Sequence, residues 1–298
     1  MIKKFTIIIL LLFLTGCTTP FGAIPLVSDV SVAKLQEKYN ASPEVRGKYT
    51  LDGASLVRNK IVNPEKDKYK NEPKDEIKVR IGNKSDLLGA DAEFVPSIEL
   101  TRWNEVSFKI EPITGQLGAI KNKQLSFEGE KIIYEDNQRK YEMSETTEEE
   151  GGYKMGWYLK EKPATNKVEF SLTAKGLDFF YQPPLTEEYQ NGYSEEFKKE
   201  IVVSETQVKD LEGNVLVERP VEVVGSYAIF HKSKGGLVDS NGKSYGTGKF
   251  GHIYRPRICD VINSCVWGEL FIDANAGIYR ITISQSWLDT AKYPIKSE

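Results

Sequence analysis

GELFIDANAGIYRITIS, residues 268–284, contains two short β-type runs on either side of a polar turn, and this segment decides the fold class. In its second run, apolar and polar side chains alternate from Tyr279 to Ser284. Such alternation is typical of a strand with one buried and one solvated face. Because Asn275 to Gly277 supply the turn, the segment predicts an antiparallel hairpin, which needs no crossover helix.

Four further segments repeat this arrangement of paired runs around a turn. They are IELTRWNEVSFKIEP (98–112), KIIYEDNQRKYEM (131–143), GWYLKEKPATNKVEFSL (156–172, with its turn at 163–166) and VVSETQVKDLEGNVLVERP (202–220). A high content of Tyr, Phe and Trp beside only three Met residues also favours strands. We therefore expect an all-β, mainly antiparallel, β-sandwich-like fold with few short helices, built as one large or two smaller modules.

Composition divides the chain into five parts. We expect a signal peptide at 1–16, an N-terminal segment with a charged tether at 17–77, a first β-module at 78–182, a connector with a helical turn at 183–200, and a second β-module at 201–298. The tether is the charged, Pro-broken stretch from Asn59 to Lys78, which would hold the folded part away from a membrane. Before it, the apolar residues of Ser31 to Tyr39 fall near one face and predict a short helix.

The first 17 residues combine two lysines, an apolar run and a cysteine. Ten mostly apolar residues follow Lys4, too few to span a membrane but enough for the core of a signal peptide. The end of this run, Leu14-Thr15-Gly16-Cys17, resembles the lipobox of bacterial lipoproteins. The resemblance implies cleavage before Cys17, a diacylglyceryl group on its sulfur and acylation of the new amino terminus. Two or more acyl chains make a stable anchor, so it implies attachment to the cell membrane or outer membrane, facing the extracytoplasmic side.

The net charge bears on the possible partners, and the cysteine content bears on disulfide formation. The chain from Cys17 onward has 38 basic residues, the 40 of the full chain less Lys3 and Lys4, and 43 acidic ones. A net charge of −5 without a basic tract argues against a nucleic-acid partner. The remaining cysteines, Cys259 and Cys265, flank a five-residue loop between two β-type runs in an oxidising compartment. We expect a disulfide there, which the loop-entropy formula values at about 2.4 kcal/mol.

Three patterns suggest a metal or phosphate site, but their spacing argues against one. His231, His252 and the two cysteines would suit zinc, yet KFGHIYRPRIC (249–259) is expected as one strand that points His252 and Cys259 to opposite faces. GKSYGTGKFG (242–251) lacks the spacing of a phosphate loop, and Asp239 to Gly242 lacks the later ligands of a calcium loop. We expect hydrogen-bonded histidines and no cofactor.

Two sets of side chains are candidates for sugar chemistry. A glycoside hydrolase needs two carboxyl groups across the scissile bond, and five carboxylates lie in or near β-type runs: Glu105, Glu111, Glu169, Asp178 and Glu269. A flat ring stacks on the apolar face of a sugar, which makes Trp103, Tyr254 and Trp267 the candidate binding residues. Aromatics on strands more often form core or cross-strand pairs. Since no Gly-x-Ser-x-Gly motif is present and Ser233 is merely adjacent to His231, we assign no catalytic residue.

Residues 168–295 contain VVGSYAIFHKSKGG, TGKFGHIYRPRI, VWGELFID and ITISQSWLDTAKYPI. These stretches resemble an uncharacterised β-rich module of bacterial and phage-like surface proteins, for which no reaction is assigned. The leading hypothesis is a lipid-anchored, non-catalytic structural or binding module of the envelope, whose partner is the membrane together with a cell-wall polysaccharide or a protein. Two alternatives stay open: a lipid-anchored carbohydrate-active enzyme with paired carboxylates, and a phage-encoded lipoprotein that modifies the host envelope.

Overall fold

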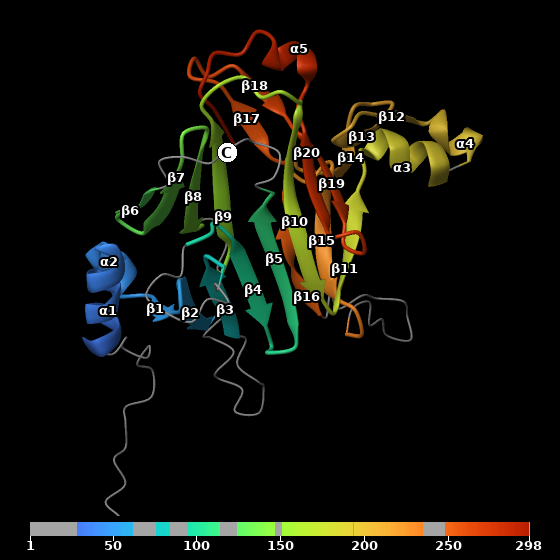
Figure 1. The fold of residues 1–298 in the computed structure, drawn as a ribbon. Helices are drawn as coiled ribbons and strands as arrows, with labels where there is room; N and C mark the ends of the chain where they lie inside the picture. Colours follow the sequence, from blue (N-terminus) through green and yellow to red (C-terminus); the bar gives the residue numbers. More distant parts are fainter. Residues whose placement is uncertain are drawn as a thin grey trace, which may run out of the picture.

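Two large antiparallel sheets lie face to face and form a sandwich (Figure 1). The computed structural model describes residues 29–61, 76–83, 94–113, 124–146, 151–192, 194–234 and 248–297. The first sheet has eight strands, in the order β1 (Thr50–Asp52), β2 (Ser55–Ile61), β3 (Glu76–Ile81), β4 (Ile98–Arg102), β5 (Val106–Pro112), β10 (Lys167–Lys175), β20 (Ile278–Thr282) and β19 (Glu269–Asp273). The second has seven, in the order β18 (Cys265–Trp267), β17 (Arg257–Cys259), β21 (Ile295–Ser297), β9 (Tyr153–Leu159), β8 (Arg139–Glu145), β7 (Lys131–Glu135) and β6 (Gln124–Glu128).

Two three-stranded sheets complete the described fold. One consists of β11 (Leu177–Gln182), β15 (Ser226–His231) and β16 (Lys249–Ile253), and the other of β12 (Ile201–Val203), β13 (Gln207–Asp210) and β14 (Val215–Glu218). The helices are short: α1 (Asp29–Tyr39), α2 (Pro43–Arg46), α3 (Leu185–Gly192), α4 (Glu195–Lys198) and α5 (Gln285–Leu288). The all-β, mainly antiparallel fold class with few short helices is therefore confirmed.

One hydrophobic core fills the space between the two large sheets. Phe170 and Ile281 enter it from the eight-stranded sheet, and Ile132 and Met143 from the seven-stranded sheet, each almost fully buried. The alternation that predicted the last hairpin is confirmed, because Tyr279, Ile281 and Ile283 are buried while the residues between them are not. β19 and β20 pair as expected.

Three other predicted hairpins form as well, and one does not. β4 pairs with β5, β7 with β8, and β13 with β14. The segment 156–172 was expected to fold back on itself at 163–166, but this prediction is wrong, since β9 and β10 lie in different sheets. The polar connection carries the chain from one sheet of the sandwich to the other, where β10 pairs with β5 and β20.

The stretch 249–259 also differs from the prediction of one continuous strand. β16 ends at Ile253 and β17 begins at Arg257 in another sheet, with Pro256 between them. Proline lacks the N–H that a continuous ladder needs, so the chain leaves one sheet here and enters another. The expected disulfide is confirmed, because Cys259 lies opposite Cys265 and their sulfurs are bonded at 2.07 Å.

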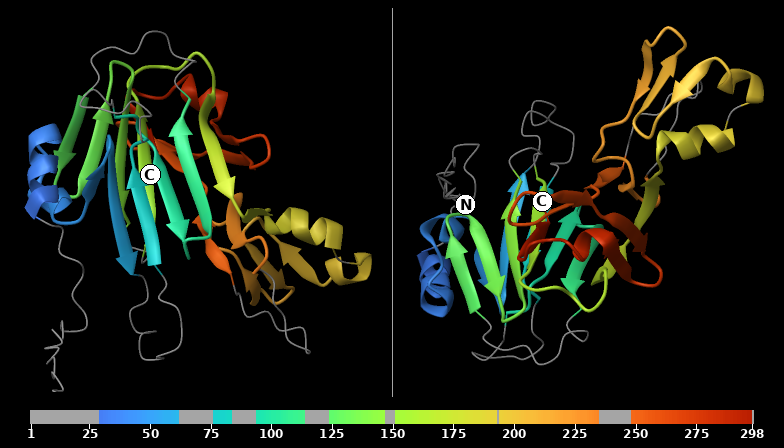
Figure 2. Two further views of the ribbon diagram at one scale, coloured as in Figure 1. Left: turned by 60° about the horizontal axis from the view of Figure 1, so that its bottom comes forward. Right: turned by 90° about the horizontal axis from the view of Figure 1, so that it is seen from above.

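Strands from both expected β-modules share the sheets of the sandwich. β10 from residues 78–182 pairs with β20 from residues 201–298, and β9 pairs with β21. Of the two arrangements left open by the sequence, this pairing favours one large sandwich over two separate ones. The connector 183–200 contains α3 and α4 and begins a projecting part of the chain that returns to the sandwich at β15 (Figure 2).

The N-terminal segment is part of the folded body. α1 is present as expected, and Leu35, Val45 and Tyr49 are buried in the sandwich core. The expected tether differs from the structure at its ends, since Asn59 of β2 pairs with Lys78 of β3. The stretch therefore connects neighbouring strands of one sheet and does not separate the fold from its N-terminus. Residues 62–75 of this stretch, the expected signal peptide with Cys17 and residues 235–247 lie outside the described residues.

Candidate functional site

The outward side of the sheet β11–β15–β16 gathers aromatic side chains, and we call this set the aromatic face: Phe180, Ala228, Phe230, His252 and Tyr254. Cross-strand pairing places Phe180 of β11, Ala228 of β15 and His252 of β16 in one row. Phe230 lies two residues from Ala228 on the same side of β15, and Tyr254 directly follows β16. Side chains two apart on a strand share a face, so the row and its neighbours point the same way.

The opposite side of this sheet packs against the sandwich, which is why the aromatic face is turned outward. Tyr227 and Ile229 of β15 are buried, and the Tyr227 hydroxyl accepts a hydrogen bond from Ile272 N of β19 at 3.3 Å. The Phe179 ring of β11 lies 6.2 Å from that of Phe108 on β5. These contacts hold the small sheet against the part of the eight-stranded sheet that runs from β5 to β19.

The rings of the aromatic face are accessible from solvent. Phe180 is 51% exposed and meets Phe230 edge to face, with ring centroids 5.7 Å apart. Tyr254 is 40% exposed, and its ring lies 4.6 Å from the imidazole of His252. Between Phe180 on β11 and His252 on β16, Ala228 of β15 contributes only a methyl group. The arrangement offers apolar ring surface on either side of a small central residue.

Polar groups on the same side have defined hydrogen bonds. Ser226 Oγ donates to Val223 O at 2.5 Å and lies 2.6 Å from His252 Nε2. A hydroxyl has one proton to donate, so His252 Nε2 carries the hydrogen in its bond to Ser226, and the imidazole orientation is fixed. Asp178 and Gln182 flank Phe180 along β11, and Gln182 Nε2 donates to Phe180 O at 3.2 Å. Aromatic surface bordered by amide, carboxylate and imidazole groups suits a ligand with hydroxyl groups around an apolar face.

Of the three aromatic residues proposed from the sequence, the structure brings only Tyr254 onto this face. Trp103 occupies the turn between β4 and β5, where its half-buried ring lies 4.8 Å from the Arg102 guanidinium and 5.9 Å from His231. Trp267 is also half-buried, with the Arg255 guanidinium 4.7 Å from its ring. Sequence reasoning missed Phe230 of β15 and also Phe180 of β11, whose strand LDFFYQ has no alternation to show which side is exposed.

Three of the five carboxylates share the outward side of the eight-stranded sheet. Glu111, Glu169 and Glu269 belong to β5, β10 and β19 and point away from the core. Glu111 is paired with Lys109 at 2.7 Å and Glu169 with Arg280 at 2.6 Å. The fourth, Asp178, lies two residues from Phe180 on β11, beside the aromatic face. The ion pairs make Glu111 and Glu169 part of a charge ladder along the outward side of the sheet.

The fifth carboxylate, Glu105, accepts hydrogen bonds from two side chains. Hydrogen bonds from Lys234 and from His231, whose Nε2 is 3.0 Å from Glu105 Oε2, lower the pKa of this carboxyl. A general acid needs a raised pKa, so Glu105 is shifted in the opposite direction. His231 Nδ1 accepts the backbone N–H of Ser233 at 3.2 Å, which leaves Nε2 as the donor to Glu105. The structure therefore joins Ser233, His231 and Glu105 in a link between the β4–β5 turn and the end of β15.

Comparisons with protein-family models, with curated proteins and with solved structures found no match for this chain. Within the described ranges, none of the helices combines the length and apolar character needed to cross a membrane.

Proposed function

We propose that this protein is a lipid-anchored, non-catalytic module of the bacterial envelope that binds polysaccharide through the aromatic face. The observation that carries the proposal is the row Phe180–Ala228–His252 on the outward side of β11–β15–β16. Rings with a small residue between them fit the flat apolar face of a sugar ring. The neighbouring Asp178, Gln182 and His252 side chains supply hydrogen-bonding groups for its hydroxyls.

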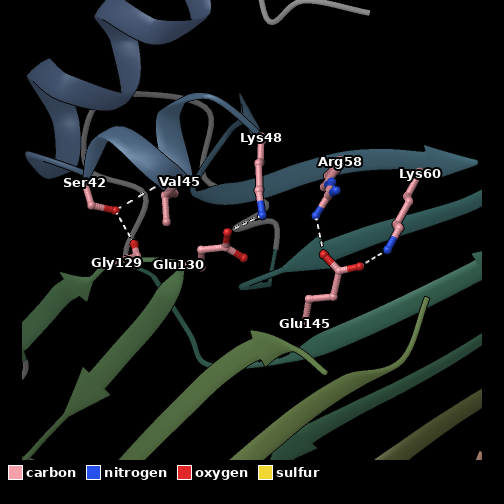
Figure 3. A network of polar contacts seen from close by, with 8 residues as sticks. All are labelled: Ser42, Val45, Lys48, Arg58, Lys60, Gly129, Glu130 and Glu145. Atoms are coloured by element: carbon pink, nitrogen blue, oxygen red, sulfur yellow. Dashed lines mark hydrogen bonds and ion pairs between the residues drawn. The ribbon is translucent and has the colours of Figure 1, made fainter. Parts of the chain in front are cut away.

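The anchoring part of the proposal rests on the lipobox at Leu14–Cys17 and on the short distance from it to the fold. Eleven residues separate Cys17 from α1, which limits the connection to about 40 Å at full extension. α1 and the segment after it are attached to the sandwich: Tyr39 Oη donates to Ala54 O at 2.7 Å, and Ser42 Oγ donates to Gly129 O at 2.6 Å (Figure 3). An acylated Cys17 would therefore keep the sandwich close to the bilayer.

The binding experiment uses co-sedimentation of the chain from Thr18 onward with purified peptidoglycan sacculi. A stacked ring contributes about 1 kcal/mol, so replacing both Phe180 and Tyr254 by Ala is expected to weaken binding about thirtyfold. Phe271→Ala is the matched control, because Phe271 is 45% exposed on the outward side of a different sheet. Equal sedimentation of the folded double variant and the control, or no sedimentation of the parent chain, would refute binding of this polysaccharide through the aromatic face.

Lipid anchoring through Cys17 is tested by a separate experiment. Cys17→Ser in the full chain is expected to abolish incorporation of radioactive palmitate and to move the protein from the membrane fraction to the soluble fraction. Palmitate labelling that persists in Cys17→Ser would show that the lipid is attached elsewhere. Since the two experiments have separate readouts, anchoring and sugar binding can fail independently.

A further inference from the structure

Residues 183–225 form a projection that we call the arm. It comprises α3, α4 and the sheet β12–β13–β14, and it leaves the sandwich between β11 and β15 (Figures 1 and 2). The arm has a small core of its own, made by Leu185, Tyr189, Ile201 and Val208, which is separate from the core of the sandwich. The Arg219 guanidinium closes its base, donating to Pro183 O and, at 2.8 Å, to Glu188.

The strand β14 is exposed along its whole length. It lies at the edge of its sheet, and all four of its residues are exposed, including Leu216 at 54%. Natural edge strands are normally protected by charges, by proline or by a covering segment. The first three residues of β14 are Val215, Leu216 and Val217, without a charge or a proline. Such an edge is a template for pairing with another strand.

The main-chain groups of β14 alternate in direction. Arg219 N donates inward to Thr206 O at 2.8 Å, and Val217 is paired with Val208 of β13. Because successive peptide groups on a strand point to opposite sides, the N–H and C=O of Glu218 point away from β13. An incoming strand would meet these groups first.

The net charge of the arm indicates which charge an incoming strand that pairs with β14 would carry. The arm contains ten acidic and four basic residues, a net charge of −6, whereas the whole chain has a net charge of −3. Pairing two copies of the arm through β14 would bring two strongly acidic surfaces together, and like charges disfavour this. A basic strand would be attracted instead.

We propose that β14 adds an extended, basic strand of a partner protein to the sheet of the arm. The partner segment would alternate apolar and cationic residues, so that its main chain pairs with β14 while its Lys or Arg side chains lie near the carboxylates of the arm. This interaction surface is distinct from the aromatic face, and it does not depend on sugar binding.

The test uses the ¹⁵N-labelled chain from Thr18 onward and a synthetic ten-residue peptide of alternating Lys and Val. Binding is expected to shift the amide signals of Val215 to Glu218 and to slow hydrogen exchange of the Glu218 amide. Glu218→Pro removes the outward N–H at an edge position that tolerates proline. It is expected to weaken binding at least about tenfold, the loss expected when a main-chain hydrogen bond is removed and a clash is introduced.

Glu218→Gln is the matched control, because it removes the same charge and keeps the N–H; it is expected to change the affinity about two- to threefold. The proposal is overturned if the proline and glutamine variants bind the peptide equally, or if a Glu–Val peptide binds as well as the Lys–Val peptide. It is also overturned if sedimentation equilibrium shows a dimer of the parent chain that Glu218→Pro dissociates, since β14 would then pair with a second copy. Sacculus binding should not change in either variant, which separates this failure from failure of the polysaccharide proposal.

Discussion

The ion pair between the two sheets near the N-terminus provides a quantitative test of the packing. Glu145 of β8 accepts hydrogen bonds from Arg58, at 2.8 Å, and from Lys60, both on β2 of the opposite sheet (Figure 3). The three side chains are only 14%, 16% and 23% exposed, in the order Glu145, Arg58 and Lys60. Glu145→Gln keeps the shape of the side chain but leaves two largely buried cations without their counter-charge.

The expected cost lies between two limits. Exposed ion pairs contribute about 0–1 kcal/mol, and removing one partner of a fully buried pair costs about 3–5 kcal/mol. Because these side chains are mostly but not fully buried, we expect Glu145→Gln to lower the free energy of unfolding by about 2 kcal/mol. For a chain of this length, that corresponds to a fall of about 3 °C in Tm.

The loss of unfolding free energy in Glu145→Gln should depend on pH. Burial alone would raise the pKa of Glu145, but hydrogen bonds from Lys60 and Arg58 outweigh burial and lower it below the ordinary value of 4.5. A carboxyl with a lowered pKa in the folded state contributes stability above the unfolded pKa and loses it as the pH falls through the folded pKa. The difference between parent and variant is therefore expected to be full at pH 7 and to shrink progressively below pH 4.5.

Urea unfolding followed by circular dichroism, between pH 3 and pH 7, measures this difference. Glu130→Gln is the matched control: Glu130 pairs with Lys48 at 2.5 Å in the same region, but the Lys48 and Glu130 side chains are 32% and 51% exposed. The control is expected to cost no more than about 1 kcal/mol. Equal losses in the two variants, or a Glu145→Gln loss that is unchanged at pH 3, would refute the reasoning that burial makes this pair strong.

Three further predictions concern stability and are measured by the same urea unfolding. Replacing Cys259 and Cys265 together by Ser should cost about 2.4 kcal/mol, the value for so short a loop, and reduction of the parent should give the same loss while reduction of the double variant gives none. Phe170→Ala removes a nearly fully buried ring from the sandwich core and should cost about 3–5 kcal/mol. Gly82→Ala should cost about 2–4 kcal/mol, because Gly82 has a φ of +84° and an added Cβ would lie 2.4 Å from Phe94 Cε2; an unchanged midpoint would contradict this.

Local sequence patterns predicted structure that depends on contacts between residues close together in the chain. They failed where contacts between distant residues determine the structure. The hairpin β19–β20 could be predicted because its turn and both strands lie within 17 residues. Polar residues at 163–166 also signal a turn, but no local feature says whether the next strand returns to the same sheet or crosses to the other. That choice depends on the pairing of β10 with β20, whose partners Phe170 and Tyr279 are far apart in the chain.

The candidate site was harder to predict for a related reason. In LDFFYQ, Phe179, Phe180 and Tyr181 are consecutive aromatics, so the alternation that marks the buried face of other strands is absent. The exposed side is decided by the sandwich, which covers Tyr227 and Ile229 of the neighbouring strand. Tyr254 was found because a flat aromatic ring can stack on a sugar, whereas the Ala228 between the rings has no chemical signal of its own.

The strand order determines where the proposed anchor lies relative to the two proposed binding surfaces. α1 and β1 lie at one edge of the eight-stranded sheet, and β19 lies at the other. With neighbouring strands about 4.8 Å apart, seven intervals separate these edges by about 34 Å. The hydrogen bond from Ile272 N to Tyr227 Oη attaches the sheet of the aromatic face beside β19, and the arm projects from that same sheet. Since a lipid on Cys17 would be connected through α1 at the opposite edge, we expect the protein to orient with both surfaces away from the membrane. Vesicle-bound acylated protein should therefore lose the arm to added protease as fast as the free chain does, and protection of the arm by vesicles would contradict this orientation.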